Sequence, residues 1–315
     1  MEALAPARRP VRVIALINQK GGVGKTTTSV NLAAALADAG RPTLLADLDP
    51  QAHASIHLGI EPTDDQDTIY DLLLEPDEAD ADRLPVAREN LTVAPAETDL
   101  AAIENELSEA PDRNRRLRRA LERFGERYEF VVLDCPPSLG LLTINGLAAA
   151  KEVIIPMQAH FLALQGVGKL LETVTLVRGT EAEPGLNPDL RVSGVVLCMH
   201  DKQATHTQEV VDDLESFFSE ARDQPNSPWR YARVLRPPIR RNIKLAECPS
   251  FGQTIFEYAP TAAGAEDYRE LAQSLMKEWD QHLAKRADRA TEVKPEASHE
   301  IAVTDEPLPA EHHTP

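Results

Sequence analysis

The sequence predicts an α/β protein with a mostly parallel, doubly wound sheet and helices on both faces. Short apolar runs alternate with stretches of helical periodicity through most of the chain, which is the pattern of a parallel sheet covered on both sides. A glycine-rich segment joins the first apolar run to the first helical stretch. The length of 315 residues suffices for one large core, and we expect a single domain over residues 1–286.

The expected strands are short runs rich in Val, Ile and Leu: Val11–Ile17, Thr43–Ala46, Leu91–Ala94, Phe130–Leu133, Val153–Pro156 and Val192–Leu197. Helices are expected where apolar residues recur at helical spacing: Thr26–Ala39, a short one near Ile69–Leu74, then Leu117–Phe124, Gly168–Val177, Glu209–Phe218 and about Ala265–Leu283. After Lys285 the chain turns polar and contains several prolines. We expect residues 287–315 to form a disordered acidic tail.

Several classes of protein are disfavoured by composition. No apolar run approaches the roughly 20 residues of a membrane span, and the first residues lack the apolar stretch of a signal peptide. The three cysteines, Cys135, Cys198 and Cys248, are far apart and form no C-x-x-C pair, so neither a disulfide framework nor a zinc site is indicated. A cytoplasmic protein is expected, with no membrane partner.

The charges are unevenly distributed. The net charge is −18, but ten of the acids lie in residues 61–82, which contain no Lys or Arg. Residues 224–246 reverse the balance with six cations and no acid, and a second arginine cluster spans residues 113–119. Because a field is local at physiological salt, an acidic chain can still present a basic patch that attracts DNA phosphates. A solvated basic face is the competing interpretation.

The glycine-rich segment is Lys20-Gly21-Gly22-Val23-Gly24-Lys25-Thr26-Thr27. It ends as a phosphate-binding P-loop does, in G-K-T, although Gln19 stands where the standard pattern has its first glycine. Residues without a Cβ let backbone N–H groups converge on phosphate oxygens, and the following helix adds its dipole. We expect Lys25 to contact the β- and γ-phosphates and the Thr26 hydroxyl to ligate Mg²⁺.

Acidic side chains follow two of the predicted strands. Asp47 and Asp49 stand two residues apart at the end of one strand, so both side chains point the same way. Asp134 ends another apolar run, Val131–Leu133. Three acids in this order after a P-loop indicate a nucleotide triphosphatase rather than ordinary loop caps.

The motif K-G-G-x-G-K-T-T resembles that of the deviant Walker A ATPases, a group that includes ParA/Soj, MinD and the nitrogenase iron protein. The resemblance implies that Lys20 reaches the nucleotide of a second subunit in an ATP-dependent homodimer. It also implies a water-activating role for Asp49 and places Asp47 and Asp134 near the Mg²⁺. Hydrolysis of ATP is expected to be slow until a partner completes the site.

Residues 239–252, I-R-R-N-I-K-L-A-E-C-P-S-F-G, resemble a stretch of the Soj-type partition ATPases. By this resemblance Arg241 and Asn242 lie close to the nucleotide, and Lys244 contacts DNA together with Arg240, Arg241 and Lys202. Gln203 stands where that branch has a second DNA-contacting arginine. The implied function is non-specific DNA binding and chromosome or plasmid segregation, with hydrolysis stimulated by a ParB-like centromere-binding partner and the protein associated with the nucleoid.

Two alternatives remain at this stage. A MinD-like ATPase would carry a basic, bulky-apolar C-terminus for the membrane, whereas residues from Lys285 onward hold seven acids and four Lys or Arg. A cargo-positioning ATPase, acting on a protein array, would share the whole fold and differ in its partner.

Overall fold

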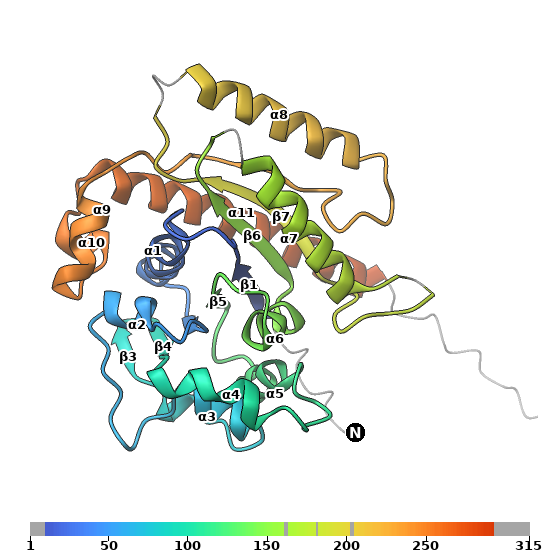
Figure 1. Ribbon diagram of the computed structural model, residues 1–315. Coiled ribbons are helices and arrows are strands. Elements are labelled where there is room, and N and C mark those ends of the chain that lie inside the picture. The colour runs from blue at the N-terminus through green and yellow to red at the C-terminus, as the bar shows by residue number, and fades with distance from the viewer. Residues whose placement is uncertain (1–9, 161–162, 181, 202–204, 293–315) are drawn as a thin grey trace, which may run out of the picture. The chain divides into compact units, whose positions relative to one another are not determined.

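The computed structural model describes residues 10–160, 163–180, 182–201 and 205–292. These residues form an eight-stranded sheet in the order β3-β4-β2-β5-β1-β6-β7-β8, parallel throughout except for the antiparallel pair of β3 and β4. Figure 1 shows this sheet among its helices. The strands are β1 (Arg12–Leu16), β2 (Thr43–Asp47), β3 (Val86–Arg88), β4 (Leu91–Ala94), β5 (Phe130–Asp134), β6 (Glu152–Met157), β7 (Arg191–Leu197) and β8 (Arg233–Leu235).

The predicted fold class is confirmed, and each of the six predicted strands is present. Strands β3 and β8 were not predicted, because they have three residues each and such short edge strands carry too few residues to show a period. The helix predicted at Ile69–Leu74 is also present with those bounds.

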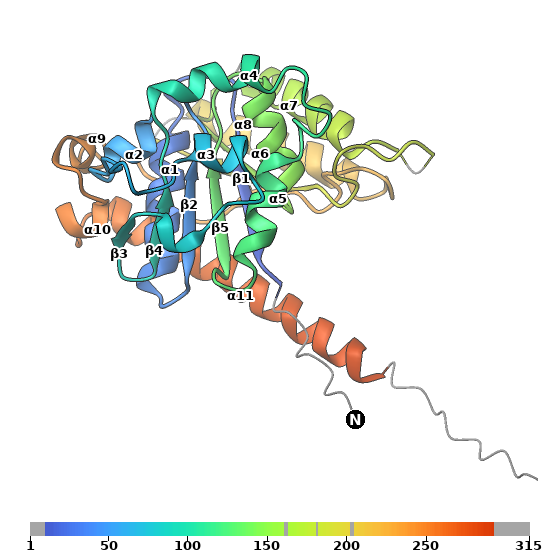
Figure 2. The same cartoon turned by 90° about the horizontal axis from the view of Figure 1, so that it is seen from below.

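Helices cover both faces of the sheet (Figures 1 and 2). Helix α1 packs on the central strands, and the part of α11 that ends at Met276 lies on the same face, where Tyr268 Oη is 3.1 Å from Thr28 Oγ1. Helices α5, α6 and α7 pack in sequence against one another on the other face. The helices are α1 (Lys25–Asp38), α2 (His53–His57), α3 (Ile69–Leu74), α4 (Ile103–Glu106), α5 (Arg116–Phe124), α6 (Leu141–Ala149), α7 (Ala163–Arg178), α8 (Thr205–Ala221), α9 (Lys244–Glu247), α10 (Ile255–Tyr258) and α11 (Ala263–Glu292).

The central strands are buried over their full length, as apolar runs in a doubly covered sheet require. Their register brings functional positions together: Leu16 and Asp47 are each paired with Asp134. Strand β1 lies between β5 and β6. The crossover after β1 runs toward β2 and the crossover after β6 runs toward β7, so the crevice between these two carboxyl ends is a topological switch point, where α/β proteins bind ligands.

The chain divides into two compact units, residues 1–276 and residues 277–315. Helix α11 continues to Glu292, so residues 287–292 are helical although the folded part was expected to end at residue 286. The rest of the predicted tail lies outside the described residues. None of the helices in the described ranges combines the length and the hydropathy of a membrane span.

The acidic stretch and the arginine cluster are partners in the fold. Arg119 of α5 forms ion pairs with Asp77 and with Asp112. Arg116 donates to the carbonyl of Leu74 at the end of α3, with an N–O distance of 2.7 Å. The contacts with Asp77 and Leu74 tie the arginine cluster to the acidic stretch.

His57 of α2 is buried, with 2% of its surface exposed, and its Nε2 lies 3.6 Å from Cys248 Sγ. Burial lowers the pKa of His57 from 6.5 to about 4, because it penalises the charged form. The unfolded chain therefore binds this proton more readily than the folded chain between those values.

We expect stability to fall as the pH falls from about 6.5 to about 4, by up to about 3 kcal/mol from this group. The substitution His57→Gln should flatten that part of the curve of unfolding free energy against pH, measured by urea denaturation. The matched control is His53→Gln, an exposed histidine of the same helix. Equal acid sensitivity in the two variants would contradict the assignment to His57.

Candidate functional site

The loop between β1 and α1 is shaped to receive an anion. Gly22 and Gly24 have φ angles of 72° and 94°, which residues with a Cβ adopt at a cost. Gly24 is the N-cap of α1, where no side chain caps the helix and no acid lies in the first turn. The first N–H groups of a 14-residue helix are thus left for a ligand, and such a terminus favours phosphate.

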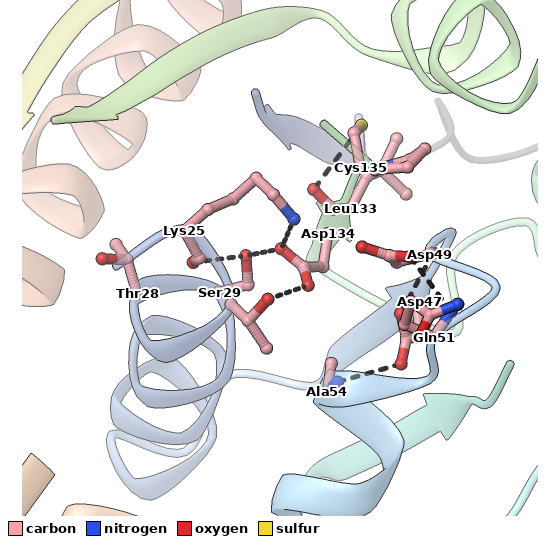
Figure 3. Close-up of polar contacts among 12 residues, drawn as sticks. Lys25, Thr28, Ser29, Asp47, Asp49, Gln51, Ala54, Leu133, Asp134 and Cys135 are labelled. Carbon is pink, nitrogen blue, oxygen red and sulfur yellow. Dashed lines mark hydrogen bonds and ion pairs between the residues drawn. The ribbon is translucent and has the colours of Figure 1, made fainter. Parts of the chain in front are cut away.

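The carboxylate of Asp134 gathers the polar side chains beside this loop (Figure 3). It is fully buried and accepts from Lys25 Nζ at 3.1 Å, from Thr26 Oγ1 at 2.8 Å and from Ser29 Oγ at 2.8 Å. Burial alone lowers the pKa of Lys25, but the neighbouring carboxylates, Asp134 foremost, outweigh burial and raise it. Lys25 therefore stays a cation in a nearly dry site.

Asp47 is held by the helix that follows it. Its Oδ2 accepts from the backbone N of Ala54 at 3.0 Å and from both the backbone N and the Oγ of Ser55 at 2.9 Å. Burial, and then repulsion from Asp134, raise the pKa of Asp47 to about 7. Because Asp47 accepts from the backbone N–H groups of Ala54 and Ser55, it caps the start of α2. The predicted Mg²⁺ role of Asp47 stays a prediction.

Asp49 lies close to these two acids (Figure 3). It is 7% exposed, its Oδ1 accepts from the backbone N of Gln51 at 3.0 Å, and its charge contributes to the raised pKa of Lys25. Figure 3 shows its carboxylate beside Asp47 and near Asp134. The structure thus brings Lys25, Thr26 and the three predicted acids together, while their roles stay predictions.

A pocket of about 320 Å³ opens next to the glycine loop. Arg241 and Asn242, predicted near the nucleotide, line it together with Gly24 and Thr27. They reach the loop because the chain after β8 runs beside the end of β7, where the backbone N of Arg241 donates to the carbonyl of His200 at 3.2 Å. Lys20 is exposed at the rim of the loop, with its Nζ 2.7 Å from His160 Nε2.

Residues 11–192 match a family model described as an AAA domain. The chain is 44% identical over 270 residues to the chromosome-partitioning ATPase Soj of Thermus thermophilus, covering 85% of this chain and 97% of that protein. It is 42% identical to the sporulation initiation inhibitor protein Soj of Bacillus subtilis over 268 residues, covering 84% and 98%. The chain belongs to the ParA/Soj family of P-loop ATPases.

A solved structure related to this ParA/Soj chain carries a nucleotide. It is described as cobyrinic acid a,c-diamide synthase from Mycobacterium smegmatis with bound ADP and magnesium, and it is 36% identical with a TM-score of 0.69. The match covers 86% of this chain and 96% of that one. Proteins with this fold therefore include one named as a diamide synthase and others named as chromosome-partitioning ATPases, so the fold by itself does not identify the substrate.

The cations predicted to contact DNA have different environments in this ParA/Soj chain. Arg240 donates to Asp267, which is 4% exposed, and forms an ion pair with Glu266 at 2.8 Å. Lys244 is half exposed, pairs with Glu247 at 2.8 Å and lies over the ring of Tyr258. Arg240 is thus bound into the fold through a buried acid.

Two further predicted cations remain. The side chain of Arg241 is exposed and forms no ion pair within the part of the chain that the structure describes. Lys202 lies outside the described residues. Arg241 and Lys244 are therefore the predicted DNA contacts that the described structure leaves most accessible.

The sequence did not reveal the two serine hydroxyl groups that donate hydrogen bonds to Asp134 and Asp47. Ser29 donates to Asp134, and Ser55 both donates to Asp47 and accepts from the backbone N of Ala96 at 3.1 Å. A serine within a helical pattern is a weak signal, because its partner comes from another element. For Ser29 the signal was its place one turn after Lys25, on the helix face that looks toward the loop.

We expect Ser55→Ala to lower the free energy of unfolding by about 2 kcal/mol, because a buried carboxylate loses a donor. Chemical denaturation measures the change. The control is Ser108→Ala, which removes an exposed hydroxyl and should shift the value by less than about 0.5 kcal/mol. Equal effects of the two substitutions would contradict a special role for the Ser55–Asp47 contact.

Proposed function

We propose that the chain binds MgATP at the loop of residues 20–27, hydrolyses it slowly, and uses the cycle to bind and release DNA during chromosome or plasmid segregation. The observation that carries the proposal is the convergence of Lys25, Thr26 and Asp134 at the uncapped start of α1. Identities of 42–44% with Soj proteins over nearly their whole length support the same conclusion.

The nucleotide would extend from the loop into the neighbouring pocket. The backbone of residues 21–27 surrounds the phosphates, and Lys25 neutralises charge on the β- and γ-phosphates. The pocket lined by Thr27, Arg241 and Asn242 has the volume of a small-ligand site, and it would take the adenine and ribose.

The magnesium ion would be held by the Thr26 hydroxyl, with Asp134 and Asp47 among the acids around it. Among the described residues, no group of three or more His, Cys, Asp or Glu forms a ready metal site. This fits an ion that keeps several waters and takes other ligands from phosphate oxygens. Asp134 would exchange its contact with Thr26 for a water of the ion.

Hydrolysis would depend on Asp49 and on a second subunit. Asp49 orients the attacking water beside the γ-phosphate, and Lys20 supplies a cation to the nucleotide of the partner in an ATP-dependent homodimer. A ParB-like partner would accelerate hydrolysis and thereby end the DNA-bound state.

DNA would be held through its phosphates, mainly by Arg241 and Lys244. The surface pair between Lys244 and Glu247 is worth about 1 kcal/mol or less, so Lys244 can exchange Glu247 for a phosphate at little cost. Contacts of this kind are independent of base sequence and steeply dependent on salt. Binding of this kind would associate the protein with the nucleoid.

The competing function is a MinD-like or cargo-positioning ATPase. It would use the same nucleotide chemistry and bind anionic vesicles or a protein array in place of DNA. The resemblance of residues 239–252 to the Soj-type stretch, and the identities of 42–44% with Soj proteins, favour DNA.

We expect Lys25→Ala to weaken ATP binding by about 100-fold or more, since it removes the phosphate cation and leaves Asp134 without its charged partner. Equilibrium binding of a fluorescent ATP analogue measures the loss. Unchanged affinity in a variant that remains folded by circular dichroism would refute the assignment of the phosphate loop.

Asp49→Ala should retain ATP and lose at least about 100-fold in turnover, because binding does not need the group that orients water. Phosphate release under saturating ATP measures turnover. The control is Asp64→Ala, an exposed acid on the loop before α3, which should hydrolyse normally. Normal turnover in Asp49→Ala would exclude its proposed role.

With ATP saturating for each protein, because Arg241 also lines the nucleotide pocket, the double variant Arg241→Ala, Lys244→Ala should reduce the slope of log affinity for random duplex DNA against log salt by about 1.8, from two lost phosphate contacts. The matched control is Arg115→Ala, Arg118→Ala, which removes two exposed cations near α5. An unchanged slope in the first variant and a reduced slope in the second would move the DNA surface to α5.

A further inference from the structure

The end of β6 and the segment after it make three contacts with the chain between β1 and α1, which contains the phosphate loop, and they come from alternate residues. The carbonyl of Pro156 accepts from Asn18 Nδ2 at 2.7 Å. The side chain of Gln158 donates to the carbonyl of Gly22 at 3.1 Å, and His160 Nε2 lies 2.7 Å from Lys20 Nζ.

This pattern follows from the topology of the sheet. Strands β1 and β6 are parallel neighbours (Figure 1), so their carboxyl ends, and the segments that leave them, lie side by side. After β6 ends at Met157 the chain turns tightly, with the backbone N of His160 donating to the carbonyl of Gln158 at 3.0 Å, and the side chains of both residues contact the loop. The segment after β6 therefore supports the loop from the side of the crevice.

In the Lys20–His160 hydrogen bond, Lys20 must be the donor and His160 the acceptor. An ammonium group has donors and no acceptor, so the bond requires an unprotonated Nε2 on His160. Lys20 is exposed, and its backbone N donates to Asn18 Oδ1 at 2.9 Å. The backbone of Lys20 is thus fixed within its own loop, while the ammonium group is held by His160.

We propose that His160 is a positioning residue that holds the Lys20 ammonium on its own subunit and so sets the protein concentration at which ATP produces a dimer. The inference rests on the proposed function, in which Lys20 acts on the nucleotide of a second subunit. To do so the ammonium group must leave His160. A subunit with Lys20 bound to His160 is not competent to dimerise, so the apparent dimer affinity is reduced by the competent fraction once for each of the two subunits.

The first experiment tests the contact itself in the nucleotide-free chain. Nitrogen NMR of the imidazole rings should show His160 Nε2 as an unprotonated acceptor, and Lys20→Ala should shift that signal. His53, an exposed histidine elsewhere, should not respond to Lys20→Ala. An unchanged His160 signal would overturn the proposal.

The second experiment tests the consequence by sedimentation with ATP over a range of protein concentrations. His160→Ala should dimerise at about 25-fold lower concentration, because one hydrogen bond supplies a factor of about five and the dimer has two subunits. His160→Glu should require a higher concentration, because a carboxylate holds the ammonium more strongly. His160→Gln, whose amide oxygen can accept, should behave as the unmodified chain does.

The outcomes separate the two proposals. Equal midpoints for the Ala, Glu and Gln variants, with normal ATP-dependent dimerisation of the unmodified chain, would overturn the role of His160 and leave the proposed function intact. An unmodified chain that binds ATP and stays monomeric at all concentrations would overturn the dimer of the proposed function, and the His160 proposal with it.

Discussion

The buried carboxylate of Asp134 is the interaction on which the rest of the site depends. It ends the central strand β5 and joins this strand to the first turn of α1 through Lys25, Thr26 and Ser29. A buried charge is costly unless paired and hydrogen-bonded, and these three donors satisfy it. The same contacts orient Lys25 and Thr26 at the mouth of the glycine loop before any phosphate arrives. The same three hydrogen bonds therefore stabilise the buried charge and organise the site.

A second carboxylate links this site to the surface proposed for DNA. Asp47 caps α2, and the far end of α2 meets residues 248–252. At that junction the backbones touch: a Cβ on Gly59 would lie 3.4 Å from the Cα of Gly252. Lys244 stands on the short helix that leads into the same segment. Asp47 and Lys244, which is proposed to contact DNA, are thus connected through α2 and residues 248–252.

The sequence was sufficient for the parts of the protein that depend on local pattern. Apolar runs predicted the buried strands, and the motif of residues 20–27 predicted which side chains would converge. Contacts set by tertiary pairing could not be foreseen. The bond of Arg240 to Asp267, the capping of Asp47 by Ser55, and the contact of Lys20 with His160 each join residues from different elements. A run of cations in the sequence likewise does not show which of them form ion pairs within the fold. Arg240, for example, pairs with Glu266 and Asp267.

In the proposed function, ATP controls the binding of the chain to DNA. The most direct test of this control is binding of the native chain to random-sequence duplex DNA at several salt concentrations without nucleotide, with ADP and with ATP. We expect salt-sensitive binding that appears with ATP and is absent in the other two states. Binding of equal strength in all three states, or none in any, would contradict it and leave an ATPase whose cargo is something other than DNA.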